Sequence, residues 1–157
     1  ESLPDRWMTG TQNHEGLAGV AAAVEYLAEI SAAAGADRRA RLRSAMNAIR
    51  EYESGLVRRL LAGLAERPRF RVWGITRPDQ LAWRAPTVAL TAEDRTPQEM
   101  AEHLAAREIY SWAGNMYALE LSERLGQEAN GGFLRLGLAH YNTAEEVDRT
   151  LAALDVL

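Results

Sequence analysis

The feature that most constrains the fold lies near the C-terminus, where residues 131–148 read as turn, strand, loop and helix start. Gly131-Gly132 predicts a turn, and Phe133–Leu138 is apolar apart from one arginine and one glycine, which is typical of a buried strand. Thr143 precedes Glu146 by three residues, the spacing of a capping box that starts a helix. The apolar residues that follow recur at helical intervals: Val147, Leu151 and Leu154.

Arg135 is the anomaly in this unit, because a single arginine stands inside an otherwise apolar strand. A guanidinium keeps its charge, so it needs an anionic partner or access to a cleft. Two interpretations stay open from the residues alone. Arg135 binds an anionic ligand, or it extends to water at a strand end or pairs with a nearby carboxylate.

The region between Pro68 and the final strand alternates strand-like and helix-like segments. In chain order we expect a strand at Phe70–Trp73, a strand at Thr87–Thr91, a helix beginning at Thr96-Pro97, a strand at Glu108–Trp112, a turn at Ala113–Asn115 and a helix from Met116 to about Gly126. This order predicts an α/β fold of the two-layer α+β type. Its small sheet, mixed or antiparallel, is covered by helices on one face.

Two helices are expected before that sheet. The first begins near Gly16 and ends at Gly35. The second is long and runs from Asp37, which is typical of an N-cap, to Pro68. The segment before them contains Thr11, Gln12 and Asn13, whose polar groups precede a helix N-terminus. Asn13 is typical of an N-cap, and the same groups also suit a phosphate.

The composition excludes several classes of protein. With 47% hydrophobic and 25% charged residues the chain is typical of a folded globular domain. A net charge of −4 gives no reason to expect nucleic acid or a membrane as partner, and no apolar run is long enough for a membrane span. There is no cysteine, the three histidines lack a metal-ligand spacing, and we expect a cytoplasmic setting.

Three stretches resemble, in the same order, segments of the class V, fold-type I pyridoxal-phosphate enzymes, which include cysteine desulfurases and aminotransferase-like relatives. They are Gly10–Gly19, which is similar to the family's Gly-Thr-x-Asn segment, Pro86–Leu90, which is similar to the first central strand of its small domain, and Arg135–Arg149, which is similar to its C-terminal end. The resemblance extends over nearly the whole chain.

The resemblance implies roles for individual residues. Arg135 would bind the α-carboxylate of an amino-acid substrate, and Thr11 would contact the cofactor phosphate of the partner subunit in a homodimer, with Gly10 and Gln12 beside it. It also implies that residues 1–36 are the end of a large cofactor-binding domain. Residues 37–157 would then form the small C-terminal domain together with its long linking helix.

All 18 basic residues are arginines, so the chain has no lysine. Enzymes of this class hold pyridoxal phosphate as a Schiff base on a lysine amine, which an arginine cannot replace. In the family that lysine lies upstream of the Gly-Thr-x-Asn segment, so we expect it to precede Glu1. The chain would then be the C-terminal portion of a longer enzyme, lacking its large domain and inactive alone.

The chain departs from the desulfurases at Ser111–Tyr117, where those enzymes have a nucleophilic cysteine on a loop. Neither asparagine nor tyrosine can form a persulfide, which favours the aminotransferase-like branch. Transamination, elimination and epimerisation all stay open. The alternative of another class is a free-standing, non-catalytic α/β binding or regulatory module that shares only the small domain's ancestry.

Overall fold

The computed structural model describes residues 5–31, 35 and 37–157. These form two compact units, residues 1–49 and residues 50–157, and the long helix α2 (Arg38–Ala65) has residues in both. The domain boundary expected after Ala36 concerns the longer enzyme and stays a prediction, and Ala36 itself lies outside the described residues.

The first unit holds a short 3₁₀ turn, η1 (Asp5–Trp7), helix α1 (His14–Glu29) and the first part of α2. Asn13 caps α1, because its Oδ1 accepts a hydrogen bond of 2.8 Å from the backbone N–H of Gly16. Asp37 caps α2 in the same way through the N–H of Ala40, so both predicted caps are confirmed. Of the residues in α1 only Ala28 is buried within this chain.

The second unit is built on a sheet of four strands: β1 (Phe70–Trp73), β2 (Thr87–Ala92), β3 (Trp112–Gly114) and β4 (Phe133–Gly137). The strands lie in the order β1-β2-β4-β3, and every neighbouring pair is antiparallel. The last strand in sequence is therefore central and the third is an edge. This arrangement resolves the expected "mixed or antiparallel" sheet in favour of the antiparallel form.

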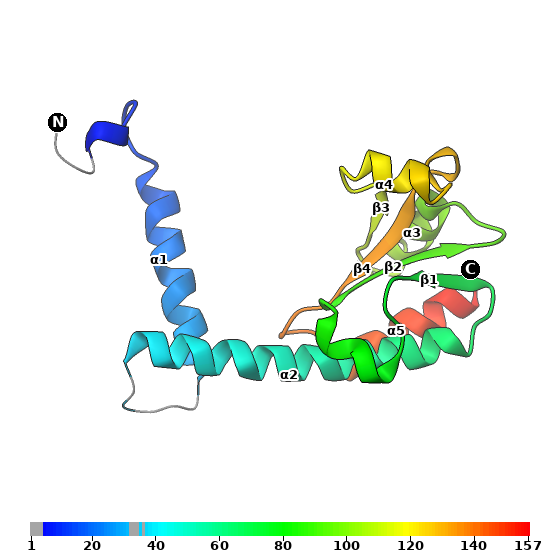
Figure 1. Cartoon of the computed structure of the whole chain (residues 1–157), viewed down its shortest axis with the longest axis horizontal. Helices are drawn as coiled ribbons and strands as arrows, with labels where there is room; N and C mark the ends of the chain where they lie inside the picture. The colour runs from blue at the N-terminus through cyan, green and yellow to red at the C-terminus, as the bar shows by residue number, and fades with distance from the viewer. Residues whose placement is uncertain (1–4, 32–34, 36) are drawn as a thin grey trace. The chain divides into compact units, whose positions relative to one another are not determined.

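Helices cover one face of this sheet (Figure 1). The strands alternate, so that Val88, Leu90, Leu134 and Leu136 point to that face and are buried. They pack against α2, helix α3 (Pro97–Ala105) and the C-terminal helix α5 (Ala144–Asp155). The helix residues in this core are chiefly Leu60, Leu64, Met100, Leu104, Val147, Leu151 and Leu154. The predicted two-layer fold with helices on one face is confirmed.

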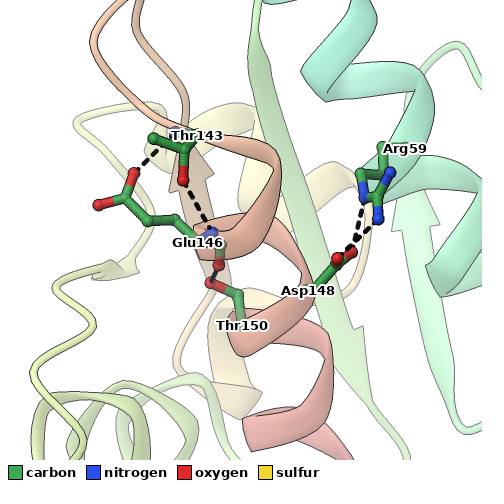
Figure 2. A network of polar contacts seen from close by, with 5 residues as sticks. All are labelled: Arg59, Thr143, Glu146, Asp148 and Thr150. Carbon is green, nitrogen blue, oxygen red and sulfur yellow. Dashed lines mark hydrogen bonds and ion pairs between the residues drawn. The ribbon is translucent and has the colours of Figure 1, made fainter.

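Helices α2 and α5 meet closely. A Cβ on Gly63 of α2 would lie 2.3 Å from a methyl carbon of Leu151 on α5, so only glycine fits there without a shift. Beside this contact, Arg59 donates two hydrogen bonds of 2.6 Å to the carboxylate of Asp148 (Figure 2). Arg67 pairs with Asp155 in the same bidentate manner. Two charge-assisted pairs thus flank the apolar seam between the helices.

The pKa of Asp148 is lowered, mainly by its hydrogen bond with Arg59, and the pKa of Asp155 is lowered, mainly by its hydrogen bond with Arg67. Both carboxylates lie at the surface, where solvent screens them, so the geometry matters more than the charge energy. The pairs fix the register of α5 along α2.

The third strand was predicted in the wrong place. The strand expected at Glu108–Trp112 begins only at Trp112 and continues to Gly114, through residues expected to form a turn. Glu108 has a φ of +58° and ends α3: its own N–H and that of Ile109 donate to carbonyls of the last helical turn. A left-handed residue at a helix end is usually a glycine. Because this position is a glutamate, the sequence did not indicate the helix end.

Helix α4 (Leu119–Arg124) starts three residues later than the predicted Met116, because Met116 and Tyr117 both have φ near +60° and form a turn. A further pair of 3₁₀ turns, η2 (Pro78–Trp83) and η3 (Glu128–Asn130), completes the unit. Among the described helices none is both long and apolar enough to cross a membrane.

Candidate functional site

The sheet face that the helices leave uncovered is the candidate site, and we call it the open face. It is defined by the side chains that alternate with the buried ones: Arg71, Trp73, Thr87, Ala89, Thr91, Trp112, Gly114, Phe133, Arg135 and Gly137. This set contains two arginines and no carboxylate. The open face therefore favours an anion over a cation.

Arg135 stands at the centre of this face. The strand pairing places Ala89 opposite it on β2 and Trp112 opposite it on β3, while Trp73 pairs with Ala89 from β1. One row across the sheet thus reads Trp73, Ala89, Arg135, Trp112. The neighbours of Arg135 two residues along β4 are Phe133 and Gly137, so only small or aromatic groups surround it.

The Arg135 side chain is exposed and forms no hydrogen bond or ion pair with the described residues. Its open-face companion Arg71 differs, because the Arg71 guanidinium lies 3.9 Å from the centre of the Trp73 ring. This cation–π contact stabilises the Arg71 charge within the sheet. Of the two open-face arginines, Arg135 is the one whose guanidinium has no ion pair or stacking partner among the described side chains.

Trp73 is held from several sides. Its indole N–H donates to Thr91 Oγ1 at 3.1 Å, and Phe133 packs edge-on against its ring with centroids 5.5 Å apart. Phe133 is buried by this contact although it belongs to the open face. The β1 side of the open face is therefore formed by packed aromatic rings.

The turn from Gly114 to Tyr117 borders the open face, and the structure shows what holds it. The Asn115 side chain donates to the Glu128 carboxylate at 3.1 Å and accepts a hydrogen bond of 3.1 Å from the N–H of Tyr117. Gly132, with φ +82°, packs so tightly that a Cβ there would lie 2.4 Å from the backbone of Gly114. Positive φ at Tyr117 is a strained conformation maintained by these contacts.

The loop after β4 is fixed by Asn142. Its Oδ1 accepts a hydrogen bond from the Ala139 N–H at 2.8 Å, its Nδ2 donates to Glu146, and its carbonyl accepts from the Tyr52 hydroxyl at 2.6 Å. The predicted capping box of Thr143 and Glu146 is confirmed (Figure 2). These bonds, the Asn142 side chain first, lower the pKa of Glu146. The end of the strand that bears Arg135 is thereby anchored.

The other predicted site residues lie in the first unit. Thr11 and Gly10 are exposed, Gln12 is half-buried, and all three directly precede the capped start of α1. An exposed hydroxyl beside a helix N-terminus can bind a phosphate. These residues belong to the first unit, whereas Arg135 belongs to the second.

Sequence reasoning identified Arg135 but assigned no role to its cross-strand neighbour. That neighbour, Trp112, is not in the core of this chain, since 59% of it is exposed. A correct strand boundary would have revealed the pairing, because alternation from Trp112 places its side chain on the same face as Arg135.

A groove of about 400 Å³ lies between residues 108–110, the end of β4 and α5, and Leu60 is among the residues that line it. Arg135 does not line it. No group of three or more potential metal ligands occurs within the part of the chain that the structure describes.

Comparison with known proteins identifies the family. The family described as "Aminotransferase class-V" matches residues 1–150. The chain belongs to the class V aminotransferase family.

Individual relatives agree with this assignment. An aminotransferase-like protein of Gibberella zeae is 38% identical over 115 residues, which is 71% of this chain and 28% of that protein. A cysteine desulfurase of Salmonella agona is 30% identical over 96% of this chain and 32% of its own length. The apo structure of a cysteine desulfurase from Thermococcus onnurineus superposes with a TM-score of 0.77 at 27% identity, covering 98% of this chain and 33% of that one.

The class V chain described here thus spans about a third of the length of the relatives it matches. The predicted resemblance to this family, and to a portion of its members, is confirmed. The chain is part of a class V aminotransferase or cysteine desulfurase-like enzyme.

Proposed function

We propose that this chain is the C-terminal part of a pyridoxal-phosphate enzyme that acts on an amino acid, and that Arg135 binds the substrate α-carboxylate. One observation supports this best. The Arg135 guanidinium has no ion-pair partner among the described residues, and it lies at the centre of a sheet face that carries no carboxylate. The guanidinium fork matches a carboxylate in size and geometry, so a bidentate pair is the expected contact.

The surroundings of Arg135 suit that task once other polypeptide covers the open face. In this chain alone the side chain is exposed, and water weakens any ion pair it makes. Covering the face removes that water, and a hydrogen bond to a charged group is then worth about 1.5–3 kcal/mol. We assign the covering role to the large domain that we expect in the longer enzyme, since this chain spans only about a third of the length of its relatives.

Pyridoxal phosphate is the cofactor that we propose for the longer enzyme, where it acts as an electron sink at the substrate's α-carbon. Residues at the start of α1 suit the phosphate group of this cofactor. The exposed Thr11 hydroxyl, with Gly10 and Gln12 beside it at the start of α1, suits the phosphate of a partner subunit's cofactor. The chain contains no lysine to bind the other end, so we expect it to be inactive by itself.

The turn beside the open face favours the aminotransferase-like branch over cysteine desulfuration. The chain has no cysteine, and the turn presents Met116 and a fully exposed Tyr117. A phenol cannot accept sulfur as a thiolate does. We therefore propose a transferase or lyase reaction on an amino acid, in a cytoplasmic homodimer.

The test uses the full-length enzyme that contains this chain, with an Arg135→Ala variant and an Arg71→Ala control from the same face. Amino-acid affinity is measured by titration of the cofactor's visible absorbance. We expect Arg135→Ala to weaken affinity by roughly 10- to 100-fold, the equivalent of about 1.4–2.8 kcal/mol. Arg71→Ala should change it by less than about threefold, because Arg71 stacks on Trp73.

Unchanged affinity in Arg135→Ala would remove the role we assign to Arg135. A reading frame that encodes no lysine-bearing domain before Glu1, with a stable and monomeric product, would instead favour the non-catalytic binding module.

A further inference from the structure

We propose that Trp112 forms the wall of the substrate side-chain pocket and that the enzyme prefers amino acids with bulky apolar side chains, aromatic or branched aliphatic. This inference rests on the proposed function, because it takes Arg135 as the carboxylate-binding residue. It adds the class of amino acid and the residue that selects it.

The first step is position. Trp112 pairs directly with Arg135 across the antiparallel β3 and β4. Side chains opposite each other on such strands leave the same face with Cβ atoms about 4.5–5.5 Å apart. A carboxylate held by the Arg135 guanidinium therefore places the rest of an amino acid within reach of the indole ring.

The second step is availability. The other open-face tryptophan, Trp73, is stacked on Arg71, hydrogen-bonded to Thr91 and packed against Phe133. Trp112 is engaged by no hydrogen bond or ring contact in the described part of the chain, and 59% of it is exposed. An indole is a large apolar surface whose exposure is unfavourable unless something covers it.

The third step is room. Three of the open-face positions next to the pair of Arg135 and Trp112 are small: Ala89 on β2, Gly114 on β3 and Gly137 on β4, while the fourth neighbour, Phe133, is buried and packs against Trp73. No side chain longer than a methyl group rises from these three positions. The floor beside the indole can therefore accept a large group.

The fourth step is charge. The open face has no carboxylate to pair with a basic side chain. Its second cation, Arg71, is already stacked on Trp73, two strands away from Arg135. A basic side chain would lose its hydration without gaining a partner, and an acidic one would meet indole rather than a free cation. An apolar side chain meets the surface that it prefers.

The experiment measures kcat/KM of the full-length enzyme for a panel of amino acids: alanine, leucine, phenylalanine, aspartate and lysine. The variants are Trp112→Ala, the conservative Trp112→Phe, and Trp83→Ala as a matched control. Trp83 is another exposed tryptophan, but it lies on η2, outside the sheet. Equilibrium binding of 3-phenylpropanoate and propanoate, two carboxylates that cannot react, provides a readout independent of turnover.

We expect the wild type to prefer phenylalanine or leucine over alanine, aspartate and lysine. Trp112→Ala should lower the phenylalanine-to-alanine ratio by at least about 10-fold, with the same loss in the ratio of the two carboxylate affinities. Trp112→Phe should restore most of both ratios, and Trp83→Ala should leave them unchanged.

The outcomes separate the two proposals. If Arg135→Ala binds every amino acid as well as the wild type, the proposed function fails and this inference fails with it. If Arg135→Ala loses affinity for all amino acids but Trp112→Ala leaves the ratios intact, lowers all substrates equally or improves the bulky ones, only the role of Trp112 is overturned. A wild-type preference for aspartate or lysine overturns it as well.

Discussion

Replacing Gly132 by alanine tests how the structure holds the edge of the open face. Gly132 has φ +82°, a conformation that costs an ordinary L-residue about 1–2 kcal/mol. In addition, the new Cβ would lie 2.4 Å from the carbonyl carbon and oxygen of Gly114 and 2.8 Å from the nitrogen of Asn115. These are backbone atoms, so no side-chain rotation relieves the collision.

The steric part of the effect follows from those distances. Carbon atoms in contact are normally about 3.5–4.0 Å apart, so the turn between β3 and α4 must move by roughly 1 Å. Forcing extra atoms into a packed site costs about 1–3 kcal/mol. Gly132→Ala should therefore destabilise the chain by roughly 2–5 kcal/mol in total, a large share of a typical domain's stability.

Gly131→Ala is the matched control. Gly131 has φ +86°, almost the same backbone conformation, but the nearest atom to its Cβ is Pro97 Cδ at 3.9 Å, an ordinary contact. Only the conformational cost of about 1–2 kcal/mol should remain. The difference between the two variants isolates the contact of Gly132 with the turn.

The assay is urea unfolding of the purified chain, followed by far-UV circular dichroism and tryptophan fluorescence. Amide hydrogen exchange then locates the effect, which we expect in β3 and β4. Equal destabilisation of Gly131→Ala and Gly132→Ala, within about 0.5 kcal/mol, would refute the packing argument.

Three further predictions concern helix α2 and its contact with α5. Asp148→Asn should reduce the melting temperature at pH 7 but have little effect once the pH lies below the depressed folded-state pKa of Asp148. The contribution of this carboxylate is present above the ordinary value of 3.8 and is lost as the pH falls through the folded-state pKa. A wild-type melting temperature that rises on acidification would contradict this pairing with Arg59. Gly55→Ala should stabilise the chain by about 0.5–1 kcal/mol in urea unfolding, because the helix gains propensity and a Cβ there meets open space. Gly63→Ala should instead be destabilising by about 1–2 kcal/mol despite the same gain, because its Cβ collides with Leu151, and equal effects of the two alanines would count against that contact.

Much of the fold could be predicted because its signals are local. The apolar alternation of Thr87–Thr91, the Pro97 helix start and the capping box at Thr143 each depend on residues within a few positions of one another. Each of these elements appears where the sequence placed it, and their order yielded the two-layer architecture.

The errors in the predicted element boundaries occurred where a residue adopts a backbone conformation that is unusual for its type. Glu108, Met116 and Tyr117 all have positive φ without being glycine or asparagine. At Met116 and Tyr117 the turn is closed by a hydrogen bond between residues 13 positions apart, Asn115 and Glu128. The sequence around them favoured a strand or helix, so the true ends of β3 and α4 were missed.

The candidate site was predictable only in part, for a related reason. Arg135 is visible as a charge in an apolar strand, but its neighbours are set by strand order and register. The pairing of Trp112 with Arg135 joins residues 23 positions apart and depends on a strand boundary that the sequence did not reveal. For Thr11, Gly10 and Gln12 the proposed phosphate contact stays a prediction.

The central claim is that Arg135 binds a substrate carboxylate, and a crystal structure of the full-length enzyme with a bound amino acid or carboxylate inhibitor tests it most directly. We predict two guanidinium nitrogens of Arg135 at about 2.7–2.9 Å from the ligand's carboxylate oxygens, with the ligand lying over the open face. An Arg135 side chain that is instead paired with an aspartate or glutamate of the upstream domain, with the carboxylate bound elsewhere, would contradict the account.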